Sequence, residues 1–131
     1  MTSELSLFEI DTYNSNLTFK TIFFLNVTTF QPLILSTSSS CYFLFKDLNL
    51  RKSMTSLMSL KGFKNQVHII YLTTYMLSSP APLIRATGRQ NAVKLDTCQV
   101  YESNFTGVRF IEGIDDTQVV KSSFYRISGV K

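Results

Sequence analysis

Few side chains in this 131-residue chain are of the types that do chemistry, and four of them stand at related positions. Ammonium, imidazole and carboxylate groups can together bind a charged or hydroxyl-bearing ligand. The candidate binding residues are Lys46, His68, Lys94 and Asp96, with Lys20 at an equivalent outward position. Charged residues of this kind also form the ordinary solvated face of a strand, so both interpretations stay open.

These residues predict no metal centre and no catalytic set. Calcium takes six or more oxygen ligands, and Asp96 is the only carboxylate in the group. The one acidic pair, Asp115-Asp116, falls in a polar stretch where Asp side chains bond local backbone. His68 is the only histidine of the chain and has no Cys near it, which leaves zinc without ligands. We therefore predict no catalytic residue, no metal and no cofactor.

A repeated six-residue phrase indicates which elements position the candidate residues. Clear copies begin at Leu57, Leu83 and Val108, and weaker copies begin at Leu7 and Leu33. A period of roughly 25 residues is typical of repeat architectures with one supersecondary unit per period. The 11 Phe and 6 Tyr favour strands, and no stretch keeps a helical apolar period. The sequence predicts an all-β fold.

Apolar residues recur in columns when positions are counted from the start of each phrase. Offsets ten and twelve, and then fifteen and seventeen, alternate as a strand with one buried face requires, with a bend between the two pairs. These columns hold Leu17, Phe43, Val67 and Val93; Phe19, Phe45, Ile69 and Leu95; Ile22, Leu48, Leu72 and Cys98; and Phe24, Leu50, Thr74 and Val100. A further column three residues before each phrase holds Phe30, Met54, Pro80, Phe105 and Ile127.

Other positions mark corners and one irregular copy. Gly62, Gly88 and Gly113 share offset five, where a corner requires a positive φ. In the last copy Val119 comes one place late, which predicts a one-residue insertion near Asp115-Asp116 and puts Lys121 in an apolar column.

Coiling this unit puts each residue about 4.8 Å from its equivalent in the next coil. Leu33, Leu57, Leu83 and Val108 should then stack, and His68 and Lys94 should lie side by side. Cys41 and Cys98 fall on different faces two coils apart, farther than a disulfide spans. We expect both thiols to be free.

The columns, as in Val93-Lys94-Leu95-Asp96-Thr97-Cys98 and Val119-Val120-Lys121-Ser122-Ser123-Phe124, resemble the right-handed parallel β-helix repeat of the pectin-lyase-like superfamily. The resemblance runs from Leu7 to Val130 as about five coils. Enzymes of that superfamily use acidic clusters on one outer sheet, often with calcium, plus a Lys or Arg base. The resemblance would make Lys94 such a base and Asp96 a substrate or metal contact.

Two other folds suit parts of the pattern. A leucine-rich repeat has a similar period but needs an Asn column that the sequence lacks. A ten-stranded ligand-binding barrel suits the length but does not require a period near 25 residues. The fold we predict is therefore a right-handed parallel β-helix, or β-solenoid, with roughly 25 residues per coil.

The net charge of +4 and a pI near 9.2 allow an anionic partner. Lys and Arg are spread singly and no aromatic-basic RNA-binding signature occurs, so nucleic acid is not predicted. The N-terminus is not a signal peptide, and no apolar run is long enough to span a bilayer. Asn-x-Ser/Thr triplets at Asn16, Asn26 and Asn104 agree with an extracellular or cell-surface protein.

We interpret residues 1–131 as a single β-helix segment with coils starting near 7, 33, 57, 83 and 108, incomplete at both ends because no cap is recognisable. The expected function is that of a non-catalytic segment of a secreted or surface protein whose outer faces bind glycan or protein. The alternatives are a fragment of a polysaccharide lyase or hydrolase, and a structural module that stacks end to end. Further coils or self-association at exposed ends are the other expected partners.

Overall fold

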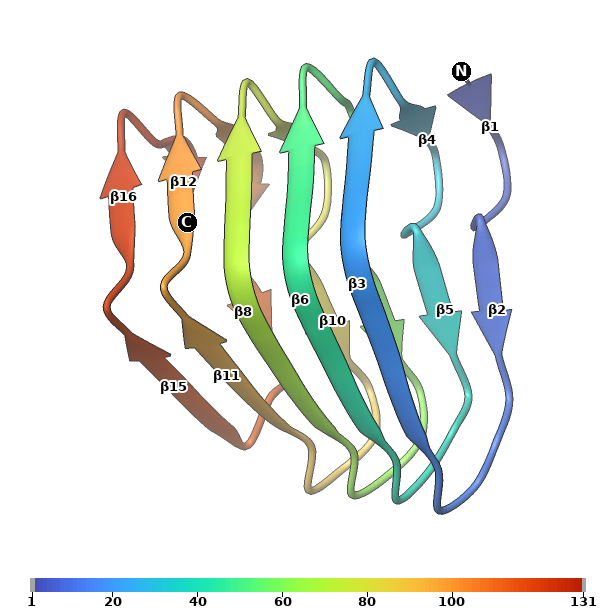
Figure 1. Cartoon of the computed structure of the whole chain (residues 1–131). Helices are drawn as coiled ribbons and strands as arrows, with labels where there is room; N and C mark the ends of the chain where they lie inside the picture. Colours follow the sequence, from blue (N-terminus) through green and yellow to red (C-terminus); the bar gives the residue numbers. More distant parts are fainter. Residues whose placement is uncertain (1, 131) are drawn as a thin grey trace.

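The chain folds as a right-handed parallel β-solenoid of about five turns in a computed structural model that describes residues 2–130 (Figure 1). Every strand pairing within these residues is parallel and links one turn to the next. The predicted fold class is confirmed. The two outermost residues of the predicted segment, 1 and 131, lie outside the described part of the chain.

The large sheet carries the candidate binding residues and lies toward the viewer in Figure 1. Ten-residue strands run along it in the first three turns, and in each of the last two turns two shorter strands take the place of one long strand. Its strands are β3 (Asn16–Leu25), β6 (Tyr42–Arg51), β8 (Gln66–Tyr75), β11 (Ala92–Asp96), β12 (Gln99–Tyr101), β15 (Asp116–Val120) and β16 (Ser123–Tyr125).

Short strands complete each turn behind the large sheet (Figure 1). One set is β2 (Phe8–Ile10), β5 (Ile34–Ser36), β7 (Met58–Leu60), β10 (Ile84–Ala86) and β14 (Ile111–Glu112). A second set is β9 (Ser78–Ser79), β13 (Asn104–Val108) and β17 (Ser128–Val130), and β1 (Thr2–Ser3) pairs with β4 (Thr28–Thr29).

Left-handed backbone recurs in three columns along the solenoid, where the chain bends within or between strands. Fourteen non-glycine residues of the described chain have φ between 47° and 64°. They fall into three columns: Asn14, Ser40, Lys64 and Gln90; Thr21, Asp47, Tyr71, Thr97 and Lys121; Asn26, Lys52, Met76, Glu102 and Arg126. The middle column is the bend predicted between offsets twelve and fifteen, and it redirects each turn of the large sheet.

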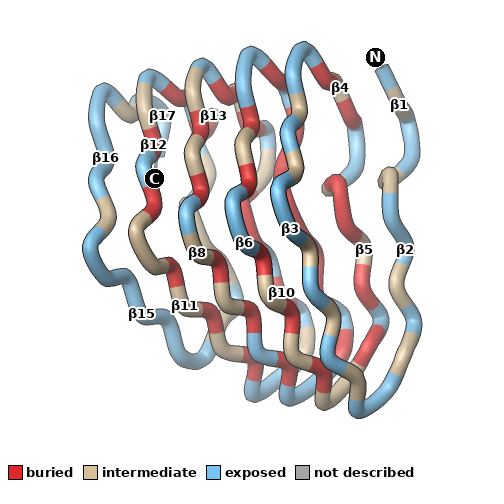
Figure 2. Tube along the Cα trace, in the orientation of Figure 1, coloured by how far each residue is buried: buried red, intermediate tan, exposed pale blue. Residues whose placement is uncertain are grey.

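The predicted apolar columns fill the interior, shown as the red positions that alternate along the strands in Figure 2. Phe43, Phe45, Leu48 and Leu50 of β6 are all at most 2% exposed, and Phe19 stacks on Phe45 with ring centroids 4.8 Å apart. Burial of each such side chain contributes about 1.5–3 kcal/mol. The alternation therefore directs the residues between them outward.

The column predicted three residues before each phrase is wrong at Phe30, Met54 and Pro80, whereas Phe105 is buried as predicted. Phe30 is 62% exposed and Met54 is 39% exposed, because the inward positions lie one residue to the side of them. Thr29, Thr55 and Ser79 occupy those positions, followed by Phe105. The hydroxyls of Thr29 and Thr55 hydrogen-bond to each other, which lets these polar side chains lie in the interior.

The predicted register of the last turn is also wrong. Val108 does not stack on Leu83; Ile84 pairs with Ile111, so Phe110 takes that place. The stretch before β14 is one residue longer than the equivalent stretch of the preceding turn, and the corner after β14 is shorter than its equivalent. The sequence instead predicted one inserted residue after β14, near Asp115-Asp116. Val119 consequently pairs with Leu95, and Lys121 stands at a bend rather than in an apolar column.

Gly62 and Gly88 share a column, but for a different reason from the one predicted. Gly62 and Gly88 do not have a positive φ. A Cβ on Gly62 would overlap the carbonyl oxygen of Ser38, and one on Gly88 would overlap that of Gly62. Close backbone approach between turns excludes a side chain there. Gly113 has the predicted positive φ, +77°, but it lies against Ala86, two columns away from Gly88.

Candidate functional site

Outward side chains of the large sheet form three columns before the bend. Strand register alone places them, because residues opposite one another in adjacent parallel strands project on the same side. The columns are Tyr42, Gln66, Ala92 and Asp116; Leu44, His68, Lys94 and Gln118; and Lys46, Ile70, Asp96 and Val120.

Lys94 lies opposite His68 in the strand register, as the column spacing predicts. Lys46 and Asp96 share the next column, but each is paired with Ile70, which lies between them. No ion pair joins Asp96 to either lysine within residues 2–130. The carboxylate of Asp96 instead accepts a hydrogen bond of 2.9 Å from the hydroxyl of Thr97. The four predicted residues therefore share one face without forming one cluster.

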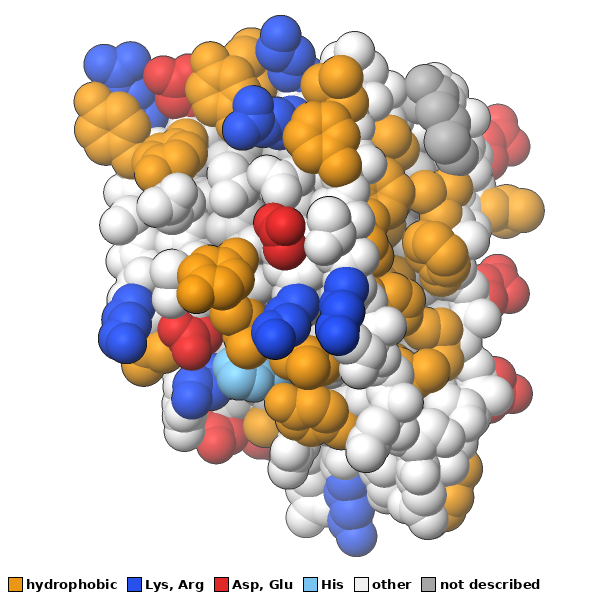
Figure 3. Space-filling model, viewed as in Figure 1, with side chains coloured by type: hydrophobic (Ala, Val, Ile, Leu, Met, Phe, Trp, Pro, Cys, Tyr) orange, Lys and Arg blue, Asp and Glu red, His pale blue; other side chains and the backbone are white. Residues whose placement is uncertain are grey.

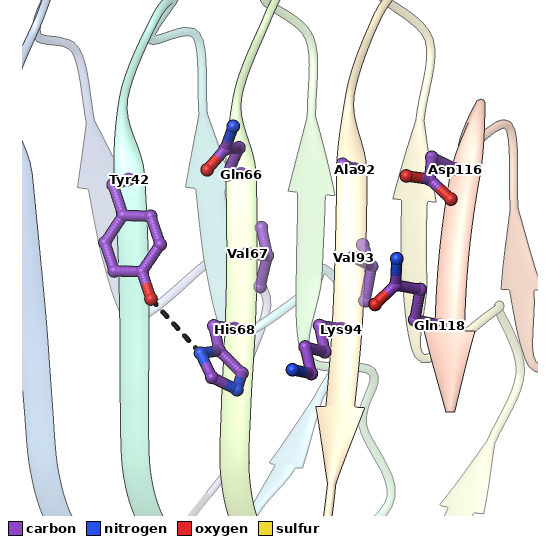
Figure 4. Close-up of a pocket in the computed structure, with 9 residues that line it drawn as sticks. All are labelled: Tyr42, Gln66, Val67, His68, Ala92, Val93, Lys94, Asp116 and Gln118. Atoms are coloured by element: carbon purple, nitrogen blue, oxygen red, sulfur yellow. Dashed lines mark hydrogen bonds between the residues drawn. The ribbon is translucent and has the colours of Figure 1, made fainter. Parts of the chain in front are cut away.

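A hollow of about 210 Å³ opens on this face around His68 and Lys94. We call it the outer hollow. It is lined by Tyr42, Gln66, Val67, His68, Ala92, Val93, Lys94, Asp116 and Gln118. Figure 4 shows Tyr42, His68, Lys94 and Gln118 projecting from four successive strands. The sequence interpretation missed Tyr42, Gln66 and Gln118, although Gln118 shares a column with His68 and Lys94 and the other two stand in the outward column beside it.

The two ring nitrogens of His68 differ in their hydrogen bonding. Its Nδ1 is 3.1 Å from the hydroxyl of Tyr42, shown as the dashed line in Figure 4. Its Nε2 is buried and has no hydrogen-bond partner in the described structure. A buried ring nitrogen without a partner is uncommon and favours a bound water or ligand group at that position. The hollow thus combines imidazole, ammonium, phenol, amide and carboxylate groups.

A column of three tyrosines lies on the same sheet beyond the bend. Tyr75, Tyr101 and Tyr125 are paired in register on β8, β12 and β16. The guanidinium of Arg126 lies 5.2 Å from the Tyr125 ring centre and pairs with Glu102 at 3.2 Å. Figure 3 shows aromatic and basic side chains gathered along this end of the face. Tyr75 and Tyr101 both stand at offset eighteen, a visible signal that the sequence interpretation did not use, whereas Tyr125 stands at offset seventeen of the irregular last copy.

Both cysteines are buried and unpaired, as predicted. Burial raises the pKa of the Cys98 thiol, and hydrogen bonds from its surroundings only partly oppose that effect. Cys98 is on the inward side of the large sheet and takes no part in the outer hollow. A protonated, enclosed thiol is unreactive.

No group of three or more His, Cys, Asp or Glu residues in the described chain is arranged to hold a metal ion. The same residues contain no helix long and apolar enough to cross a membrane. Searches of protein-family models, curated proteins and solved structures found no match to this chain. The strand pairing therefore establishes the β-solenoid, and the pectin-lyase-like resemblance remains a prediction.

Proposed function

We propose that this chain is a non-catalytic β-solenoid that binds an acidic glycan along the outer face of its large sheet. The observation that carries this proposal is that the outer hollow and the tyrosine column lie on the outer face of one sheet and share strand β8. His68 and Tyr75 both belong to β8, and seven residues of strand separate their positions by about 23 Å. That length suits an oligosaccharide rather than a single sugar.

The tyrosine column suits the apolar face of a sugar ring, and the outer hollow suits its hydroxyl groups. Tyrosine offers an apolar ring that can contact the C–H face of a sugar and a hydroxyl that stays hydrated. The amides of Gln66 and Gln118 and the Nε2 of His68 offer hydrogen bonds to sugar hydroxyls. Together these groups recognise a polar, ring-containing polymer.

Charge favours an acidic polymer over a neutral one. The outward strand positions of the large sheet carry four basic residues and three acidic ones. They are Lys20, Lys46, Arg51 and Lys94, against Asp47, Asp96 and Asp116. Lys94 is half-buried in the outer hollow, where its charge is less screened by salt than on an open surface.

Binding of uronate-containing and neutral polysaccharides to the whole chain tests this proposal. We expect the acidic polymers to bind and the interaction to weaken with added salt. Lys94→Gln should reduce affinity about tenfold, the loss of one charge-assisted hydrogen bond. Lys64→Gln, at an exposed corner, is the matched control. Equal binding of neutral polymers, or no effect of Lys94→Gln, would contradict the proposal.

The length of the polymer after the same incubation distinguishes a binding module from a lyase or hydrolase. A lyase or hydrolase would release shorter chains with new ends, whereas a binding module leaves the polymer length unchanged. Chain shortening that is lost in Lys94→Gln would support the alternative and overturn the non-catalytic proposal.

A further inference from the structure

A second hollow lies away from the large sheet and arises from unequal corner lengths. Between the Thr28 and Ile34 columns, the second turn uses five residues, 29–33, and the fourth uses five, 79–83. The turn between them uses only three, 55–57. The two longer corners therefore project on either side of a short one.

The resulting hollow has a volume of about 220 Å³, and we call it the proline notch. Its two walls are the longer corners, two coil steps or about 9.6 Å apart. Pro32 belongs to one wall, and Pro80 and Pro82 belong to the other; these are all three prolines of the chain. Because a proline ring fixes φ, both walls are stiff before any ligand arrives.

Apolar and polar groups are separated within the proline notch. Phe30, 62% exposed, extends the first wall, while Ser56 lies in the short corner between the walls and Ser59 lies just after it on β7. Neither serine hydroxyl has a hydrogen-bond partner among the described residues. Lys61 and Arg85 are exposed at the same hollow. The Arg85 Nε pairs with Glu112 at 3.0 Å, which leaves the rest of its guanidinium fork for another acceptor.

We propose that the proline notch binds an extended acidic peptide of a partner protein, with one apolar side chain between the walls and a carboxylate at Lys61 and Arg85. A rigid apolar slot of this width accepts a single side chain as an anchor. The serine hydroxyls pair with the peptide backbone, and the two cations determine its charge. This site is independent of the glycan-binding face, because none of its residues belongs to the large sheet.

A titration of the ¹⁵N-labelled whole chain tests the proposal. The probes are the capped peptides Gly-Phe-Glu-Glu-Gly and Gly-Phe-Lys-Lys-Gly, together with glucuronic acid. We expect the acidic peptide to shift the amide signals of Phe30, Ser56 and Ala81, and the basic peptide to leave them unchanged. Equal shifts from both peptides would overturn the proposal, as would shifts from glucuronic acid alone.

Paired variants separate the two recognition elements. Phe30→Ala should weaken acidic-peptide binding more than tenfold, whereas Phe63→Ala, which removes a similarly exposed ring elsewhere, should not. Lys61→Glu should weaken binding at least threefold, and Lys64→Glu should have little effect. Unchanged amide spectra of the free variants establish that the fold is intact. Full binding by both Phe30→Ala and Lys61→Glu would refute the site.

Discussion

Asn91 lies one turn beyond Asn65, and its side-chain Oδ1 accepts the backbone N–H of Asn65 at 3.0 Å. Asn65 repeats the arrangement by accepting the N–H of Cys41 at 3.1 Å and donating to the carbonyl of Ser38 at 2.9 Å. Both asparagines are at most 1% exposed. This ladder supplies hydrogen bonds at a corner where strand pairing stops.

Asn65→Ala should destabilise the fold by about 2–4 kcal/mol, because it leaves a buried N–H and a buried C=O unpaired. Chemical denaturation measures the change. Asn49→Ala is the control, since its side chain only donates to Asp47 at the surface. Equal losses in the two variants would show that the ladder adds nothing beyond ordinary side-chain removal.

Gly62→Ala should cost more than about 3 kcal/mol although Gly62 does not have a positive φ, because the added methyl meets backbone rather than a movable side chain. Gly107→Ala makes the comparison: φ there is +67°, yet nothing lies within 4 Å of the added Cβ. We expect that variant to lose only about 1 kcal/mol. Melting curves that rank the two in the opposite order would contradict this account.

Thr97→Asn should raise the free energy of unfolding by about 0.5–1 kcal/mol. Thr97 has φ 56°, a conformation that costs a β-branched residue more than it costs asparagine. Thr117→Asn, in regular strand of β15, should give no gain. The denaturant midpoints of the two variants measure this difference in stability.

The Cys98 thiol should stay unreactive toward a disulfide reagent until the chain unfolds. In the unfolded chain both Cys41 and Cys98 should react with the reagent. Its folded pKa is raised by burial, so its contribution to stability is complete below the unfolded pKa and declines as pH rises above it. Cys98→Ala should flatten that alkaline decline. Rapid labelling of Cys98 in the native state would contradict the burial argument.

Sequence reasoning predicted the coil because buried columns must be apolar, and apolar recurrence is visible in the residues themselves. It misplaced the last turn because Val119 was matched to the wrong column. The extra residue before β14 lies in the exposed stretch around Gly107, where no recurring apolar column fixes the register. Packing requirements alone could not reveal a change in an exposed corner.

The sequence likewise predicted one part of the candidate site and missed another. His68 and Lys94 were placed together correctly, since outward residues inherit the register of the buried ones beside them. Tyr42 and Gln118 were missed because polar outward columns need not repeat a residue type. The proline notch depends on a corner two residues shorter than its neighbours, and neither hydrophobic spacing nor residue type predicts the hollow that results.

The parallel pairing of each strand with the strand one turn away also bears on how the chain folds. Paired residues are separated by 22 to 27 positions, as in Val108 with Val130 and Ile84 with Ile111. Every new turn therefore closes a loop of nearly the same length and loses nearly the same chain entropy. Once two turns have formed, order can spread in either direction by equal steps.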